Sequence, residues 1–224
     1  MELLNNILWN ALSGSQRHLT LGTDTVRRYA PGLSPLVGFA DPEQPDFEAL
    51  ASYCAPGESL YCDLWTGSPP SGWQVEHEFP VLKMLWQGDS LPPLDTEGIT
   101  RLSAEHAPQA MELAALTRPG PFGPRTIELG AFYGILEQGQ LCAMVGERLY
   151  AEPLREVSAV CTHPDFQGRG LARRLLTAQI HWQRQRGETP FLHVASDNAT
   201  ARALYESLGF RDVRETRIRV IRCA

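Results

Sequence analysis

Glycines and arginines with the spacing of an anion-binding loop occur in residues 163–172, which read His-Pro-Asp-Phe-Gln-Gly-Arg-Gly-Leu-Ala. Gly168 and Gly170 have no Cβ, so the backbone there can approach a ligand closely. A long helix is predicted to start here, and the N–H groups of its first turn, together with the helix dipole, favour a negative charge. The segment therefore predicts a cradle for a pyrophosphate. Three arginines would add positive charge beside it: Arg169, Arg173 and Arg174.

Two common phosphate-binding loops do not fit this segment. A Rossmann loop has the pattern G-x-G-x-x-G, and Arg173 stands at its third glycine position. A P-loop requires a lysine after its last glycine, and the segment has none. A purely structural turn is the alternative on the glycines alone. The strand–turn–helix setting and the arginines favour a ligand.

Alternating strands and helices in the second half of the chain must position this segment. The helix is predicted over residues 168–186, because Leu171, Leu175, Ala178 and Trp182 recur on one helical face. Strands are predicted over residues 99–102, 132–137, 140–149, 156–162, 191–195 and 210–221. Further helices are predicted over residues 104–116 and 198–208, and a loop over 119–124. The order of these elements is an α/β pattern.

The first half of the chain has a less regular pattern. Residues 1–20 and 47–53 predict helices, residues 31–45 a loop, and residues 59–64 and 73–86 strands. A proline-rich connector follows at residues 88–95. We therefore predict a domain boundary there, with residues 1–96 as an α/β half of unknown role and 97–224 as the domain that holds the anion cradle.

The charge of the chain changes at the same boundary. The 224 residues carry a formal net charge of −6, which disfavours a general nucleic-acid binder. Residues 1–96 hold 12 acidic and four basic residues, whereas residues 97–224 hold 14 acidic and 16 basic residues. An anionic ligand is therefore expected in the second half, and the acidic first half would suit a cationic substrate.

The five cysteines predict no metal site. They are irregularly spaced and contain no C-x-x-C pair, so neither zinc binding nor a disulfide framework is indicated. Neither a secretory signal nor an apolar run of membrane-spanning length occurs. We expect buried free thiols, no metal, no membrane association and a cytoplasmic location.

Three motifs follow one another in the second half of the chain. Residues 167–172 read Gln-Gly-Arg-Gly-Leu-Ala, the strand before them reads Val-Ser-Ala-Val-Cys-Thr-His-Pro, and residues 198–210 read Asn-Ala-Thr-Ala-Arg-Ala-Leu-Tyr-Glu-Ser-Leu-Gly-Phe. They resemble, in this order, the Q/R-x-x-G-x-G/A signature, the V-x-V-x-P approach strand and the N-x-x-A-x-x-x-Y-x-x-x-G-F motif of the GNAT superfamily of acyl-CoA-dependent N-acyltransferases. The resemblance covers about residues 97–224. The strand residues Ser-Ala-Val-Cys-Thr-His-Pro are similar to those of the branch that includes glycine N-acyltransferases. By the same resemblance, the first half of the chain would be a degenerate GNAT-like half.

The resemblance implies a fold and a cofactor site. The fold is a mixed, mostly antiparallel sheet flanked by helices (class α/β, or α+β), splayed between its fourth and fifth strands. Acetyl-CoA would lie in the splay as a cosubstrate. The backbones of Val160, Cys161 and Thr162 would bind its pantetheine by strand addition. The first-turn amides would bind the pyrophosphate, with these residues at the site: Gln167, Gly168, Arg169, Gly170, Leu171, Ala172 and Arg173.

The resemblance also implies two residues on the last helix. Tyr205 would protonate the departing CoA thiolate, which a phenol can do when it is held beside the sulfur. The alternative is a packed aromatic side chain. Asn198 would bind CoA, or it would cap the helix as asparagine often does.

Glu156 is the expected general base for the amine. It begins the splayed strand, and strand alternation would place it on the same side as Ser158, Val160 and Thr162. The alternative is an exposed carboxylate. His193 and Ser196 are the next candidates. Cys161 as an acyl carrier is disfavoured, because nothing around it activates a thiolate.

The expected function is therefore transfer of an acetyl group from acetyl-CoA to a primary amine, by direct attack in a ternary complex. The amine would belong to an amino acid, a small metabolite or a protein. One alternative is a non-catalytic acyl-CoA-binding or sensing module. A second is a protein that binds a nucleotide or another phosphate. The sequence indicates neither the acceptor nor the acyl length nor the oligomeric state.

Overall fold

A single large sheet of eight strands organises the molecule. The computed structural model describes residues 2–224. The strands are β4 (Ser59–Asp63), β5 (Trp73–Trp86), β6 (Ile99–Arg101), β7 (Tyr133–Glu137), β8 (Gln140–Ala151), β9 (Leu154–Thr162), β10 (Thr189–Ala195) and β11 (Phe210–Cys223). Their order is β4-β11-β5-β10-β9-β8-β7-β6, and only the β9–β10 pair is parallel. The expected mixed, mostly antiparallel sheet is confirmed.

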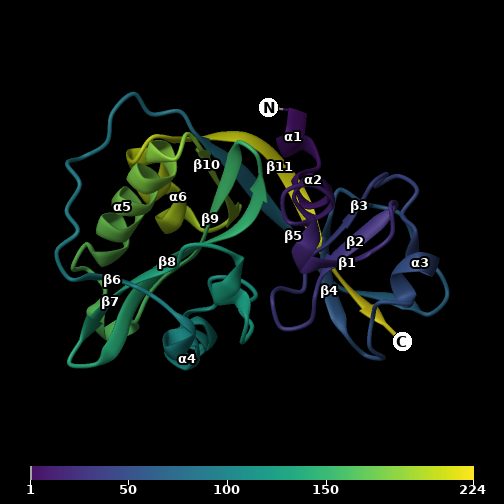
Figure 1. Ribbon diagram of the computed structural model, residues 1–224. Coiled ribbons are helices and arrows are strands. Elements are labelled where there is room, and N and C mark those ends of the chain that lie inside the picture. The colour runs from purple at the N-terminus through teal and green to yellow at the C-terminus, as the bar shows by residue number, and fades with distance from the viewer. Residues whose placement is uncertain (1) are drawn as a thin grey trace.

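Helices cover both faces of this sheet (Figure 1). On one face, α5 (Leu171–Gln185) and α6 (Ala199–Ser207) pack on β8, β9 and β10. The predicted stripe of α5 is buried at Leu171, Leu175 and Ala178. On the other face lie α1 (Glu2–Asn5), α2 (Ile7–Ser13) and α4 (Ala107–Thr117). Each helix therefore buries one apolar side against the sheet, as an α/β architecture requires.

A second, small sheet in the N-terminal part was not predicted. It contains β1 (Thr20–Gly22), β2 (Val26–Tyr29) and β3 (Val37–Phe39), all antiparallel, and it precedes α3 (Phe47–Ala51). The predicted loop over residues 31–45 is therefore wrong where β3 lies. The predicted helix over residues 1–20 is broken, because Asn6 caps a new helix, α2, by accepting a hydrogen bond from the Trp9 N–H.

The large sheet draws strands from both sides of the expected boundary at residue 96. β5 comes from the first half, yet it lies between β10 and β11 of the second half. β5 and β11 are each 14 residues long and run from the region of α5 and α6 to the region of β1–β3 (Figure 1). The division into two domains stays a prediction, and the two parts share one sheet.

The cysteines and the helices have two further properties. All five cysteines are free, and Cys62, Cys142 and Cys161 are buried. In the described part of the chain, no helix is long and apolar enough to cross a membrane.

Candidate active site

β9 and β10 separate after a short parallel pairing. They pair at three positions, of which the last joins Phe191 to Glu156. Beyond that point β9 stays paired with β8, and β10 stays paired with β5. A cavity of about 570 Å³ opens where they diverge, and Val160 of β9 and Val194 of β10 both line it. The segment Val160–Thr162, expected to bind pantetheine, lies on this diverging part of β9.

A β-bulge in β9 changes which side chains share a face. Ala159 has φ of 51°, and the register with β8 shifts between the pairs Met144–Cys161 and Gly146–Ser158. As a result Val157 and Val160, three residues apart, both pack against the cluster on the α5 face. The expectation that Glu156 and Val160 share a side is therefore wrong, because the bulge adds one residue between them.

The predicted anion cradle is an exposed turn at the start of α5. Gly168 and Gly170 have φ of 76° and 75°, a region that glycine adopts without strain. A Cβ on either glycine would meet no atom within 4 Å, so the space in front of the turn is open. Gly170 is the N-cap of α5, and Leu171 begins the helix. Gln167 and both glycines are exposed, whereas Leu171 is buried and Ala172 is half-buried.

The arginines near this turn are partly engaged by other side chains. Arg169 donates to the carboxylate of Glu137, with Nη1 at 3.1 Å from Oε2. Arg174 pairs with Asp95 at 3.1 Å. Arg173 donates to the hydroxyl of Ser207 at 2.8 Å and so connects α5 to α6. Of the three, Arg173 is the one to which the structure gives no carboxylate partner within residues 2–224.

Glu156 is buried in a network of donors. Arg148 donates to both carboxylate oxygens, at 2.9 Å from Nε and 2.7 Å from Nη2. Nδ1 of His193 lies 2.7 Å from Oε1, and the Leu149 N–H donates to Oε2 at 3.2 Å. Burial would raise the pKa of this carboxyl, but the charge of Arg148 and the hydrogen bonds from His193 and Arg148 outweigh it and hold the pKa below its usual range.

This network puts His193, rather than Glu156, at the cavity. The Glu156 side chain is 1% exposed and lies outside the cavity lining, whereas His193 lines it. An ionised carboxylate accepts only, so Nδ1 of His193 must carry the hydrogen, which leaves Nε2 as the free acceptor. Within residues 2–224 the structure gives Nε2 no hydrogen bond. Glu156 is therefore placed to orient a base, and His193 is placed to be one.

Tyr205 and Asn198 come to the cavity from α6. Both line it on the side of Val194. Burial, together with the nearby Cys161 thiol, raises the pKa of Tyr205 to about 12, so its phenol stays protonated at neutral pH. The Asn198 side chain accepts from the Ala201 N–H at 3.1 Å, which is an N-cap bond. The expected capping role of Asn198 is present.

Three further residues with side chains capable of acid–base or nucleophilic chemistry, His163, Ser196 and Cys161, lie outside the cavity lining. Nδ1 of His163 accepts from the Asp165 N–H at 3.2 Å and caps a short turn. The Ser196 hydroxyl donates to Glu215 at 2.8 Å. Burial raises the pKa of the Cys161 thiol to about 11, so a thiolate is disfavoured there. None of these three residues lines the cavity.

Two arginines that line the cavity were not predicted. Arg118 follows α4 and Arg148 lies on β8. β8 and β9 form a hairpin in which Tyr150 pairs with Arg155, and that register continued without a shift would put position 149, not 148, opposite Glu156. A register shift between Glu147 and Tyr150, which the sequence does not signal, brings Arg148 to Glu156. For Arg118 the sequence offered only its place at the end of a predicted helix.

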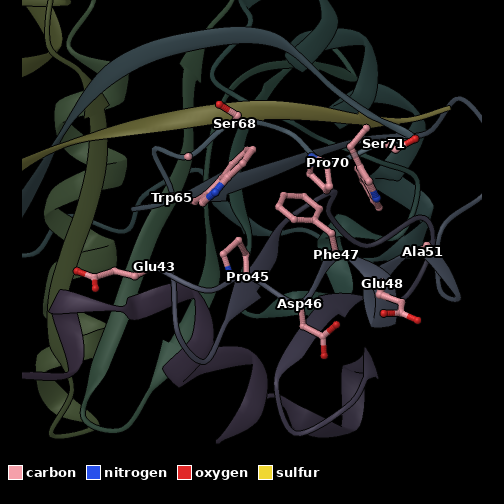
Figure 2. Close-up of a pocket in the computed structure, with 12 residues that line it drawn as sticks. Glu43, Pro45, Asp46, Phe47, Glu48, Ala51, Trp65, Ser68, Pro70 and Ser71 are labelled. Atoms are coloured by element: carbon pink, nitrogen blue, oxygen red, sulfur yellow. The ribbon is translucent and has the colours of Figure 1, made fainter.

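A second hollow, of about 700 Å³, lies in the N-terminal part around α3. Figure 2 shows the Phe47 ring near Trp65 and Pro70, with the carboxylates of Asp46 and Glu48 pointing away from the rings. Asp46 accepts from Thr25 at 2.7 Å and caps α3. No histidine, cysteine or tyrosine of the described residues lines this hollow. It therefore lacks the acid–base groups that the first cavity has.

Comparison with known proteins identifies the family. The model of the FR47-like protein family matches residues 132–220. A structure from Novosphingobium aromaticivorans DSM 12444, assigned to the GNAT family of acetyltransferases, is 36% identical, covers 99% of this chain and 98% of its own, and superposes with a TM-score of 0.89.

Shorter matches occur with two curated enzymes. Mycothiol acetyltransferase of Saccharomonospora viridis is 45% identical over 67 residues, which are 30% of this chain and 22% of that protein. The [ribosomal protein bS18]-alanine N-acetyltransferase of Salmonella typhimurium is 50% identical over 54 residues, 24% of this chain and 36% of that enzyme. The matched segments thus span well under half of these relatives. The full-length match and the shared fold show that the chain is a member of the GNAT superfamily of acetyltransferases.

Proposed function

We propose that the chain transfers an acetyl group from acetyl-CoA to a primary amine by direct attack. The observation that carries this proposal is the junction of three features at one cavity: the diverging edges of β9 and β10, a histidine with a free acceptor nitrogen, and a protonated tyrosine. The open glycine turn that begins α5 follows directly from β9.

The unpaired edge of β9 supports a binding mode for the pantetheine arm. Backbone groups of Val160, Cys161 and Thr162 would hold its amides as an added strand would. The first-turn amides of α5 would hold the pyrophosphate, where Gly168 and Gly170 leave room. Arg173 is the side chain best placed to add charge, and Asn198 would contact the arm while it caps α6.

The reaction needs one base and one acid. The neutral amine attacks the thioester carbonyl carbon, a C–N bond forms and the C–S bond breaks. Nε2 of His193 accepts the amine proton, and the Tyr205 hydroxyl donates its proton to the sulfur of CoA. The proton on His193 then returns to the Tyr205 phenolate through water. Glu156, instead of acting as the base itself, holds the imidazole in the required tautomer.

Direct transfer is supported over a covalent acyl-enzyme. Cys161 is the thiol nearest this chemistry, and burial raises its pKa to about 11, so it is a poor nucleophile. A cytoplasmic location is also part of the proposal, and the five free thiols support it.

The test compares the kinetics of a variant that lacks the proposed general acid with those of a matched control variant. Acetyl-CoA is incubated with a panel of primary amines, and the free CoA thiol is followed. Tyr205→Phe is expected to lower kcat by about a hundredfold or more, as loss of a general acid does. Tyr150→Phe is the matched control, because Tyr150 lies outside the cavity and stacks on Arg155, and it should leave kcat unchanged.

Two outcomes would contradict parts of this proposal. Equal kcat for Tyr205→Phe and the natural chain would remove Tyr205 from the reaction. Binding of acetyl-CoA without turnover on any amine would instead support the alternative, a module that binds or senses acyl-CoA.

A further inference from the structure

The cavity beside His193 has a charge opposite to that of the N-terminal half. Its lining includes Arg118 and Arg148, and no aspartate or glutamate of residues 2–224 contributes to it. The N-terminal half supplies only uncharged side chains there: Leu8, Leu36, Tyr61, Phe79 and Val81. The expected fit to a cationic substrate is therefore not supported, because the acidic residues of that half lie elsewhere.

Arg148 has one nitrogen left for a ligand. Its Nε and Nη2 are used by Glu156. The structure gives Nη1 no hydrogen bond to any described residue, and the side chain lines the cavity at 12% exposure. Nη1 faces Gly120, where an added Cβ would lie 4.0 Å from it. A guanidinium fixed by a buried carboxylate is a rigid donor.

Arg118 is an exposed residue that lines the same cavity. It is the C-cap of α4 with φ of 53°, a conformation in which glycine or asparagine is usual. Pro119, Gly120 and Pro121 follow it and line the cavity too. The structure gives its guanidinium neither an ion pair nor a hydrogen bond within residues 2–224. An unusual backbone conformation that costs free energy is consistent with a functional side chain.

Apolar side chains also line the cavity. They are Leu8 of α2, Phe79 and Val81 of β5, and Ile218 of β11. The shared sheet holds β5 and β11 in place, because the two strands pair along nearly the whole length of β5. An acceptor whose apolar group packs on these side chains would bind more tightly, because that group is removed from water.

We propose that the acceptor is a small amine that carries both a carboxylate and an apolar side chain, which is the chemistry of a free apolar amino acid. This inference rests on the proposed function. The carboxylate binds to Arg118 and to Nη1 of Arg148, and the side chain packs on Phe79 and Val81. The amine is then directed toward Nε2 of His193. A cavity of about 570 Å³ suits a small acceptor together with the thioester end of CoA.

The test compares three acceptors that differ only at the carboxylate: leucine, leucinamide and 3-methylbutylamine. Loss of a charged hydrogen-bonding partner should reduce kcat/KM roughly tenfold or more, so leucine should be acetylated at least that much better than the other two. The amine of leucinamide is a weaker base than that of leucine, so more of it is unprotonated at neutral pH. Amine ionisation therefore cannot produce a preference for leucine over leucinamide, which is the deciding comparison. 3-Methylbutylamine is a stronger base than leucine, so its kcat/KM is compared per unprotonated amine.

A pair of arginine variants assigns the effect to the cavity. Arg118→Gln should lower kcat/KM for leucine roughly tenfold and leave that for leucinamide within twofold, since only leucine has the partner of the guanidinium. Arg17→Gln is the matched control, because Arg17 is exposed and pairs only with exposed Asp24. It should change neither value.

The outcomes separate this inference from the proposed function. Equal kcat/KM for leucine and leucinamide, or equal losses for both in Arg118→Gln, would overturn the carboxylate site. Acetylation of other amines in a wider panel, with none of these three accepted, would overturn it as well and leave the proposed function standing. Failure of every amine would remove the proposed function itself.

Discussion

His193 and Glu156 divide one task between two side chains. A base must reach the substrate, and it must have a free lone pair. Glu156 has no access to the cavity, and its lowered pKa makes it a weak proton acceptor. His193 reaches the cavity, and its Nδ1 bond to Glu156 leaves Nε2 as the acceptor. In the proposed reaction the buried carboxylate is thus a positioning residue, and Arg148 keeps it ionised.

The pH dependence of kcat/KM should report this arrangement. The pKa of Glu156 is lowered, so this carboxylate is ionised across the assay range, and its protonation should add no acidic limb above about pH 4. Glu156→Gln should lower kcat, because the amide can donate to Nδ1 of His193 and so favour the wrong tautomer. The pKa of Tyr205 is about 12, so no alkaline limb from loss of its proton is expected below about pH 10.

Variants of His193 and Ser196 test which residue is the base. His193→Gln should lower kcat by roughly a hundredfold or more. Ser196→Ala should leave kcat unchanged, because Ser196 donates to Glu215 and lies outside the cavity. Equal kcat for His193→Gln and the natural chain would show that another group is the base.

Sequence reasoning named both residues but did not predict the contact between them. Glu156 and His193 were both candidates, and the strand that carries each was predicted. Their relation depends on which face each residue occupies, and a bulge at Ala159 changes the faces of β9. Alanine with positive φ leaves no sequence signal, since glycine is the residue expected there.

At the scale of elements, the proposed function depends on two neighbouring strands, β9 and β10, whose pairing ends partway along their length. β9 and β10 share three paired positions and then follow different neighbours. The sequence predicted both strands and the helix between them, because their apolar periodicity is local. Strand divergence is a relation between elements distant in the chain, so only the resemblance to a known family anticipated it.

Elements with buried charge were the hardest to predict. β2 reads Val-Arg-Arg-Tyr, and the Arg28 side chain is almost fully buried with its charge paired to Glu58 at 2.5 Å. A strand with two arginines does not show the usual apolar alternation. The partner that makes burial tolerable lies 30 residues away, beyond the reach of a local pattern.

At the scale of the whole molecule, the N-terminal part is structurally tied to the site. Lys83, the single lysine of the chain, is fully buried on β5 and pairs with Asp63 of β4 at 2.5 Å. Its cross-strand neighbour on β10 is His193. The strand that carries the proposed base is therefore held next to a buried ion pair of the first half, and the two halves share one core.

Breaking this ion pair should destabilise the whole molecule. Lys83→Met leaves the Asp63 carboxylate buried without its partner, which costs about 3–5 kcal/mol of unfolding free energy. Urea unfolding measures the loss. The double variant Lys83→Met with Asp63→Asn should lose less, because it leaves no unpaired charge.

An exposed ion pair provides the control for this measurement. Asp24→Asn removes a charge that pairs only with exposed Arg17, so it should change the unfolding free energy by less than about 1 kcal/mol. Similar losses from Lys83→Met and Asp24→Asn would contradict a shared core held together by the buried pair.

Calorimetric titration with CoA, ATP and NAD tests the central claim most directly. The account predicts that CoA binds and that ATP and NAD bind at least about tenfold more weakly, because only CoA has an arm for the cleft between β9 and β10. Gly170→Ala should weaken CoA binding, whereas the matched Gly139→Ala should not. Both glycines have positive φ and open space around a Cβ, but Gly139 lies in the β7–β8 turn. No binding of CoA, or binding of ATP or NAD as tight as that of CoA, would contradict the account.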